Sequence, residues 1–161
     1  MEIYLLRHGI AEDQRPGMKD PERALTAEGK KKLREVLQVA KTAGVKPRTI
    51  LTSPFRRALE TAEIAADVFD YKDDLILSTH LTPMSDVRDT WVDIKTHKGA
   101  AQLLLASHEP LTGLLTGFLL GAPNLAVDVK KGALIRVDVQ SFGLNPRGVL
   151  KWMLTPKLAN G

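Results

Sequence analysis

Short apolar runs recur along this chain, and most of them are followed by a stretch with helical periodicity. The first run, Ile3–Leu6, ends at Arg7 and His8, and a later one, Gln102–Ser107, ends at His108. Alternation of this kind is typical of α/β proteins, whose parallel strands lie side by side in a buried sheet. Such sheets bind ligands at the carboxyl ends of their strands. The pattern therefore predicts the fold and the place of the site together.

The predicted strands and helices indicate one α/β domain, a three-layer α/β/α sandwich with a mostly parallel sheet. Strands are expected at residues 3–6, 49–52, 75–78, 102–107, 133–139 and 149–154, the last two as an antiparallel pair, and helices within 26–44, 58–69, 86–98 and 110–120. The length of 161 residues is that of a single domain, expected to span residues 1–161. The order of the strands is not readable from the sequence.

Composition restricts the class of protein. The chain is 43% hydrophobic and 26% charged, as in globular proteins, and it has no cysteine for a disulfide, a thiolate metal site or a nucleophile. Its apolar runs are too short for a membrane span and the N-terminus shows no secretory signal, so we expect a cytoplasmic protein without membrane contact. The net charge of +4 is scattered and lacks interleaved aromatic residues, which argues against a nucleic-acid partner.

Two histidines and two arginines near the ends of strands indicate chemistry on phosphate. A neutral imidazole can attack phosphorus through one ring nitrogen while a hydrogen bond holds the other. Guanidinium groups match the oxygens of phosphate and stabilise the transferring group. We expect Arg7 and Arg57 to clamp the phosphoryl group and His8 and His108 to act on it from two sides. This scheme requires no metal ion and no cofactor.

Five short motifs follow one another along the chain: Leu6-Arg7-His8-Gly9; Leu25-Thr26 with Gly29; Ser53-Pro54-Phe55 with Arg57, Ala58 and Thr61; Leu81-Thr82-Pro83; and Ser107-His108 with Pro110. With these motifs the chain resembles the histidine phosphatase superfamily, which has the phosphoglycerate mutase-like fold, and within it the SixA-type phosphohistidine phosphatases. The resemblance covers nearly the whole chain. It implies that His8 is the nucleophile and that Arg7, Arg57 and His108 complete the phosphate pocket.

The resemblance also implies residues that bind the substrate around the phosphate. Arg57 matches the family's pocket arginine because it directly precedes an alanine, whereas Arg56 does not. Arg23 matches a family arginine that contacts the flank of the substrate, although Ala24 stands where the family usually has proline. Ser53 is a further expected substrate-binding residue.

The residue at position 80 leaves the source of the leaving-group proton open. Relatives that cleave phosphate monoesters usually have an acidic residue near this position, which protonates the alkoxide. Here the residue is His80, which we expect among the substrate-binding residues. Three interpretations stand: a polar residue at the rim, a proton donor, or a residue that does not correspond to the family's acid. Glu12, Asp13 and Glu109 are other candidate proton donors.

The resemblance implies a metal-independent phosphatase that dephosphorylates a protein phosphohistidine through a covalent phospho-His8 intermediate. Because the chain has few residues beyond the core elements, we expect an open pocket that admits a side chain of a folded partner, such as a histidine-containing phosphotransfer domain. The mildly basic surface suits an acidic partner. Two alternatives stay open: a phosphatase of small phosphomonoesters with the same pocket, and a non-catalytic module that binds phosphate or nucleic acid.

Overall fold

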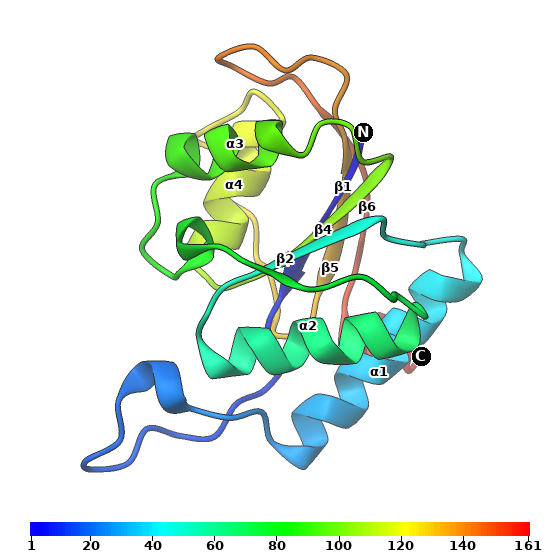
Figure 1. The fold of residues 1–161 in the computed structure, drawn as a ribbon. Helices are drawn as coiled ribbons and strands as arrows, with labels where there is room; N and C mark the ends of the chain where they lie inside the picture. Colours follow the sequence, from blue (N-terminus) through cyan, green and yellow to red (C-terminus); the bar gives the residue numbers. More distant parts are fainter.

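A six-stranded sheet lies between two layers of helices in the computed structural model, which describes residues 1–161 (Figure 1). The strands are β1 (Glu2–Arg7), β2 (Thr49–Thr52), β3 (Ile76–Leu77), β4 (Gln102–Ser107), β5 (Leu134–Asp138) and β6 (Val149–Leu154). The helices are α1 (Ala27–Thr42), α2 (Arg56–Val68), α3 (Val87–Thr96), α4 (Leu111–Leu119) and α5 (Pro156–Ala159), with short 3-10 turns η1 (Asp20–Glu22) and η2 (Thr79–Leu81). Every expected strand and helix is present, and the α/β fold class is confirmed.

The sheet has the strand order β3-β2-β4-β1-β5-β6. The first four strands in this order are parallel, whereas β5 is antiparallel to both β1 and β6. The closing pair is antiparallel, as expected, and five of the six strands therefore run in one direction. Strand β3 pairs with β2 through only two residues, Ile76 and Leu77, so the strand is shorter than the expected range of residues 75–78.

Both faces of the sheet are buried, and each has its own apolar core. Side chains of β1 alternate between the cores: Ile3 and Leu5 pack toward α3 and α4, while Tyr4 and Leu6 pack toward α1 and α2. Continuous apolar runs are what a parallel strand covered on two sides requires. Figure 1 shows the two pairs of helices on opposite sides of the sheet.

The two central strands leave the sheet toward opposite faces. The chain continues from β1 into the layer that contains α1, and from β4 into the layer that contains α4. This divergence between neighbouring parallel strands opens a crevice at their carboxyl ends, the usual ligand site of an α/β sheet. The fold thus places the residues that follow β1 and β4 beside each other.

The start of α1 supports the segment that follows β1. Thr26 caps the helix by accepting a hydrogen bond from the backbone N–H of Gly29 at 3.0 Å, and its own N–H donates to the carbonyl of Ile10 at 2.9 Å. Gly29 packs so closely on Ile10 that a Cβ would overlap the Ile10 carbonyl oxygen. The absence of a side chain at Gly29 therefore lets the loop after β1 lie directly on the helix.

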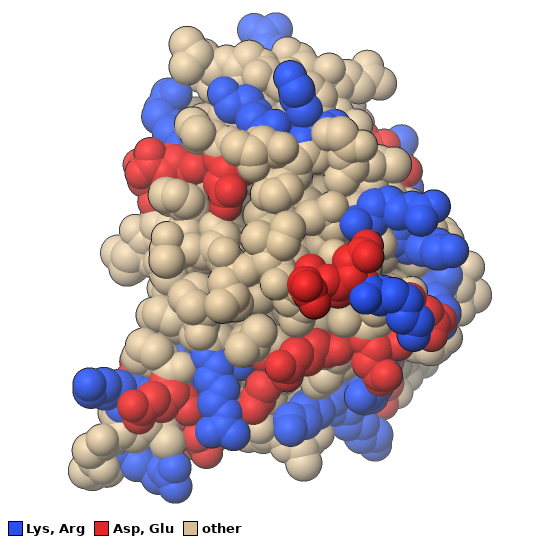
Figure 2. Space-filling model, in the orientation of Figure 1, with Lys and Arg blue, Asp and Glu red and all other residues tan.

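The surface over α1 and α2 carries charges of both signs. Ion pairs join Arg34 to Asp67 at 2.7 Å and Arg56 to Glu60 at 3.0 Å, and Figure 2 shows blue and red side chains close together over this part of the molecule. Exposed pairs of this kind contribute little to stability individually. None of the helices combines the length and the apolar character needed to cross a membrane.

Replacing Gly29 is expected to destabilise the protein. Gly29→Ala forces a methyl group against the backbone of Ile10, which cannot move without the loop after β1, and overpacking of this kind costs about 1–3 kcal/mol. Urea unfolding followed by circular dichroism measures the loss. Gly99→Ala is the matched control, because no atom lies within 4 Å of its added Cβ. Equal midpoints for the two variants would contradict the close packing.

Candidate active site

The residues that follow three parallel strands meet in one buried cluster. Arg7 and Ser107 are paired at the ends of β1 and β4, and the backbone N–H of His8 donates to the carbonyl of Ser107 at 2.9 Å. The N–H of Ser53, after β2, donates to Ala106 of β4 at 3.0 Å. His8, Ser53 and His108 are 6%, 0% and 1% exposed. The register of the sheet thus brings together residues that lie far apart in the sequence.

The ring of His8 is held in one tautomer by the chain itself. Its Nδ1 lies 2.7 Å from the carbonyl oxygen of Gly9. A carbonyl oxygen only accepts hydrogen bonds, so Nδ1 carries the proton and Nε2 presents its lone pair. The Nε–H of Arg57 donates to Nε2 at 3.3 Å. His8 therefore directs the unprotonated nitrogen Nε2 toward the guanidinium of Arg57, and an unprotonated nitrogen is what a nucleophile that attacks phosphorus needs.

Arg57 lies at the start of α2 with its guanidinium in the cluster, and it is 5% exposed. Its Nη1 donates to the carbonyl of Asp20 at 2.9 Å, and its Nη2 donates to the carboxylate of the same residue at 3.1 Å. The guanidinium carbon lies 5.3 Å from the centre of the Phe55 ring. Arg56 points elsewhere and pairs with Glu60 on the surface of α2, so the structure brings Arg57 and not Arg56 into the cluster.

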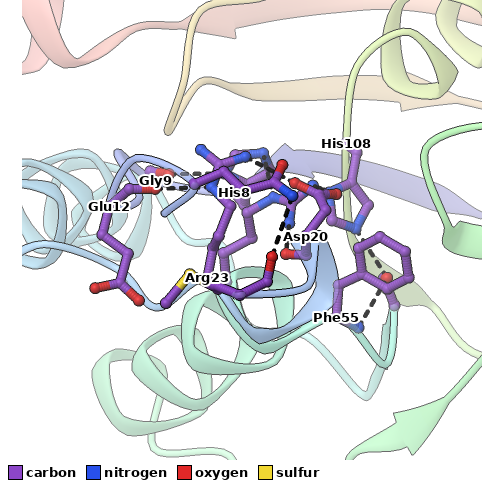
Figure 3. Close-up of polar contacts among 11 residues, drawn as sticks. His8, Gly9, Glu12, Asp20, Arg23, Phe55 and His108 are labelled. Carbon is purple, nitrogen blue, oxygen red and sulfur yellow. Dashed lines mark hydrogen bonds and ion pairs between the residues drawn. The ribbon is translucent and has the colours of Figure 1, made fainter. Parts of the chain in front are cut away.

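Asp20 is a site residue that the sequence did not indicate. Its carboxylate accepts hydrogen bonds from Arg57 and, at 2.9 Å, from Nη1 of Arg23 (Figure 3). The segment 12–22 has the composition of a polar loop, and nothing in it distinguishes Asp20 from the other acids there. The turn η1 is too short to leave a periodic pattern, and only the folded loop shows that Asp20 reaches Arg57.

Arg23 lies at the edge of the cluster, where its expected role on the flank of the substrate stays a prediction. Besides its bond to Asp20, its Nε donates to the carbonyl of Glu12 at 2.7 Å. The side chain of Glu12 in turn accepts from the N–H of Ala24 at 3.1 Å. Backbone bonds of this kind hold Arg23 without the proline that the family usually has at position 24.

His108 faces His8 across the cluster. The ring centres are 5.1 Å apart, and Nε2 of His108 lies 2.8 Å from the hydroxyl oxygen of Ser53. The Phe55 ring contacts His108 edge-on with centres 5.1 Å apart. Ser53 thus orients the ring of His108. The expected contact of Ser53 with the substrate stays a prediction. The Nδ1 of His108 is buried and has no hydrogen-bond partner within the protein.

Arg7 forms the third side of the cluster. Its Nη1 donates to the carbonyl of Val129 at 2.7 Å, and its Nε is buried without a partner. Together with Nδ1 of His108, it gives the cluster two unsatisfied buried nitrogens. A buried polar atom without a partner is rare in proteins, and such atoms at a cationic cluster are suited to an anion with several oxygens.

Burial and positive neighbours keep both imidazoles neutral. Burial lowers the pKa of His8 to about 4, assisted by the charges of Arg57 and Arg7 and opposed by the hydrogen bond to Gly9. Burial likewise lowers the pKa of His108 to about 3, with His8 and Arg57 acting in the same direction. At neutral pH the positive charge of the cluster therefore comes from the arginines, and His8 keeps its lone pair.

The two nearby carboxyl groups differ in their environments. Partial burial raises the pKa of Asp20, but hydrogen bonds from Arg23 and Arg57 outweigh this, and the net shift is downward. Burial raises the pKa of Glu109, against the effects of a 2.7 Å hydrogen bond from the N–H of Gly113 and of the charge of Arg7. Asp20 is thus a stable anion, whereas Glu109 holds a proton to a higher pH than an ordinary glutamate.

His80 does not join the cluster through its side chain. It lies in η2 with its ring exposed, and its polar contacts are made by backbone atoms, to Ser78 and Thr90. Its expected role in substrate binding stays a prediction.

Thr61, one of the motif residues, connects the loop after β1 to the start of α2. Its hydroxyl oxygen accepts a hydrogen bond from the N–H of Gly9 at 3.2 Å, and its hydroxyl group donates to the carbonyl of Arg57 at 2.7 Å. Thr61 is fully buried. One side chain thus fixes the backbone beside both His8 and Arg57.

Comparison with protein families gives a match between residues 3–82 and the histidine phosphatase superfamily, branch 1. This segment contains His8 and Arg57 in the geometry described above. The chain belongs to the histidine phosphatase superfamily. Members of this superfamily include phosphatases. The cluster of two arginines and two histidines is the candidate active site of this phosphatase.

Relatives within the superfamily cover nearly the whole chain. The phosphohistidine phosphatase SixA of Escherichia coli K12 is 28% identical over 158 residues, which are 97% of this chain and 94% of that protein. The structure of the protein histidine phosphatase SixA complexed with tungstate is similar with a TM-score of 0.87 at 28% identity, covering 98% of both chains. The α-ribazole phosphatase of Shigella flexneri shares the fold, with a TM-score of 0.77 at 16% identity over 97% of both chains.

The neutral histidines are expected to make stability depend on pH. Their pKa values are about 4 and about 3 in the folded protein and about 6.5 when unfolded, so below pH 6.5 the unfolded chain binds more protons. The free energy of unfolding therefore falls as the pH drops from about 7 to about 4. Replacement by His108→Gln removes one such group and is expected to reduce the slope by up to about 1.4 kcal/mol per pH unit.

Urea unfolding at a series of pH values measures both slopes. All carboxyl groups and His8 are retained in the variant, so the difference between the slopes reports the loss of His108 together with its coupling to His8 and Asp20. Identical slopes would show that His108 is not held neutral in the folded protein.

Proposed function

We propose that this chain is a phosphohistidine phosphatase that removes the phosphoryl group from a histidine of another protein through a covalent phospho-His8 intermediate. The observation that carries the proposal is the neutral ring of His8, whose Nδ1–H is fixed on Gly9 and whose Nε2 lone pair faces Arg57. The similarity to SixA over nearly the full length supports the same substrate class.

The first step transfers the phosphoryl group to His8. Nε2 of His8 attacks phosphorus, a bond between Nε2 and phosphorus forms, and the bond from phosphorus to the substrate imidazole breaks. The substrate ring, protonated on its other nitrogen, takes the electron pair of that bond and leaves as a neutral imidazole. Arg7 and Arg57 bind the non-bridging oxygens, and Nδ1 of His108 donates a hydrogen bond to one of them. The hydrogen bond from Nδ1 of His8 to Gly9 becomes stronger as the ring gains positive charge.

In the second step a water molecule attacks phosphorus of phospho-His8. The bond from phosphorus to Nε2 breaks, inorganic phosphate leaves, and the neutral ring of His8 is restored. The same arginines stabilise the transferring group in both steps, because the phosphoryl group moves little between them. The protein's own side chains thus account for the electrostatic stabilisation. That SixA forms a complex with tungstate, itself an oxyanion, agrees with such a pocket in a relative.

The leaving group favours a phosphohistidine over a phosphate ester. An imidazole leaves far more readily than an alkoxide and depends less on a strong internal acid. Asp20, the carboxyl group in contact with Arg57, is bound by two arginines and has a lowered pKa, which makes it a poor proton donor at neutral pH. The cluster is therefore better suited to break a P–N bond than a P–O bond.

A phosphatase of small phosphomonoesters is the second candidate, and Glu109 is the observation that favours it. Its pKa is raised, so its carboxyl group is a better proton donor than that of Asp20. Glu109→Gln separates the two functions: it would slow the cleavage of alkyl phosphate esters if Glu109 protonates their leaving group, and it leaves the cleavage of phosphohistidine unchanged.

The proposed function predicts His8-dependent release of phosphate from a phosphorylated histidine-containing phosphotransfer domain, with slower cleavage of p-nitrophenyl phosphate. Malachite green detection of phosphate, with chelator present, measures both rates. His8→Ala is expected to abolish both, and mass spectrometry at alkaline pH is expected to find an acid-labile phosphate on His8 in the native protein. Rapid cleavage of the ester alone would contradict the proposed substrate class.

Two neighbouring arginines provide a matched test of the pocket. Arg57→Gln removes a buried donor to the transferring group and is expected to lower kcat by about 10²–10³. Arg56→Gln removes only a surface ion pair with Glu60 and is expected to leave kcat within about twofold. Steady-state kinetics on the phosphorylated domain measure the difference. Similar losses in the two variants would contradict the assignment of Arg57.

A further inference from the structure

A groove of about 840 Å³ lies beside the candidate active site on the side of Arg7. Four segments form it: the loop after β1, the first turns of α1, the segment before β5, and the end of β6 with the start of α5. Its cationic residues besides Arg7 are four lysines, and we call it the lysine groove: Lys32, Lys130, Lys131 and Lys157.

The lining of the lysine groove is positively charged. Its lining has five cationic side chains and one carboxylate, Asp128, which gives a net charge of +4, equal to that of the entire chain. Lys32 pairs with Glu28 and Lys130 with Asp128, both at 2.8 Å, but Lys131 and Lys157 have no ion-pair partner. Over α1 and α2 the surface is mixed, with Arg34 paired to Asp67 and Arg56 to Glu60 (Figure 2).

The lysine groove adjoins the candidate active site at Arg7, which belongs to both. Arg7 and Gly9, on either side of His8 in the sequence, both line it. The backbone N–H of Gly132 donates to the carbonyls of Arg7 and His8 at 3.2 and 3.0 Å, so the segment that carries Lys130 and Lys131 is attached to the end of β1. The lysine groove and the buried cluster therefore meet at the end of β1.

The kind of cation indicates the kind of ligand. Lysines are flexible point charges, whereas the planar guanidinium is the side chain that binds a single phosphate in two places. Here the lysines are distributed over three separate elements, and apolar side chains lie between them, among them Ile10 and Met153. Such a surface suits several carboxylates spread along a polypeptide better than one compact phosphate.

The surface at the loop that carries Asp20 differs in charge. A second hollow there is lined by Glu12, Arg15, Glu22 and Arg56, two acids and two bases, and has no net charge. An acidic partner is thus attracted more strongly to the lysine groove than to this hollow. This difference favours an orientation in which the acidic part of a phosphorylated protein lies in the groove.

We propose that the lysine groove binds the acidic segment that flanks the phosphohistidine of the protein substrate. The proposal rests on the proposed function and adds to it the surface by which the substrate protein is recognised. The buried cluster binds the phosphoryl group that every substrate has, and the lysine groove distinguishes among the proteins that bear it.

Neutralising two lysines tests the proposal. Lys32→Gln with Lys157→Gln removes two charges from the groove, while Lys131 is kept because its charge acts on His8. On a phosphorylated histidine-containing phosphotransfer domain with an acidic surface, KM is expected to rise about three- to tenfold with little change in kcat. On p-nitrophenyl phosphate both constants are expected to stay within about twofold. Raising the salt concentration reproduces the effect in the native protein.

The matched control is Lys72→Gln with Lys98→Gln, two exposed lysines that line neither the groove nor the candidate active site. It changes the net charge equally and is expected to leave KM for the phosphorylated domain unchanged. A second control neutralises the acidic residues of the substrate domain, after which the groove variant and the native protein are expected to have the same KM. Thermal unfolding verifies that all variants fold.

The outcomes separate the two proposals. Binding of the phosphorylated domain to His8→Asn protein, measured by fluorescence anisotropy, tests the groove without turnover. Weaker binding of the groove variant in this background supports the groove even if the native protein cleaves only esters. Equal binding overturns it, whether or not phosphate release depends on His8. ATP is the probe for small anions. If ATP binds in a way that depends on the groove lysines but does not displace the bound phosphorylated domain, the groove is a site for small anions, and this result would also overturn the proposal.

Discussion

The hydrogen bond from His8 to the carbonyl of Gly9 is the contact on which the rest of the site depends. It makes Nδ1 the protonated nitrogen and so decides that Nε2, and no other atom of the ring, faces the cluster. That carbonyl keeps its place because Gly9 is itself fixed, by its N–H bond to Thr61 and by close packing on Gly29. The chemistry of the His8 ring thus depends on the packing of the loop after β1 against α1, at two glycines that have no side chain.

The second constraint is the charge of the buried cluster. Two guanidinium groups in a pocket are costly unless an anion compensates them, and Asp20 supplies part of the compensation from a loop outside the sheet. The same arginines hold the imidazoles neutral, which the nucleophile needs. A bound phosphate introduces further negative charge, and opposite charge within a few ångströms favours the protonated form of an imidazole. Bound phosphate would therefore raise the pKa of His108, whose Nδ1 has no hydrogen-bond partner within the protein.

The sequence was sufficient to predict the elements of the fold, because each buried strand is a continuous apolar run and each long helix has one apolar face. The convergence of strand ends in a parallel sheet also indicated His8 and His108, whereas the choice of Arg57 over Arg56 came from the family resemblance. The sequence did not reveal Asp20, whose position depends on how an irregular loop folds back across α2. The strand order and the contact of Ser53 with His108 likewise follow from long-range packing that no local pattern records.

Recognition of the partner and chemistry on phosphorus make opposite demands on the surface. The phosphoryl pocket must be buried and fixed, because stabilisation of the transferring group requires donors that do not reorganise. A surface that selects among proteins gains from exposed, flexible charges that act at a distance and release the product readily. The buried Arg57 and the half-buried Arg7 meet the first demand, and the lysines of the groove, three of them exposed, meet the second. Arg7 lines both and joins the two surfaces. Under the two proposals, a protein held in the lysine groove would deliver its phosphohistidine to an already organised pocket.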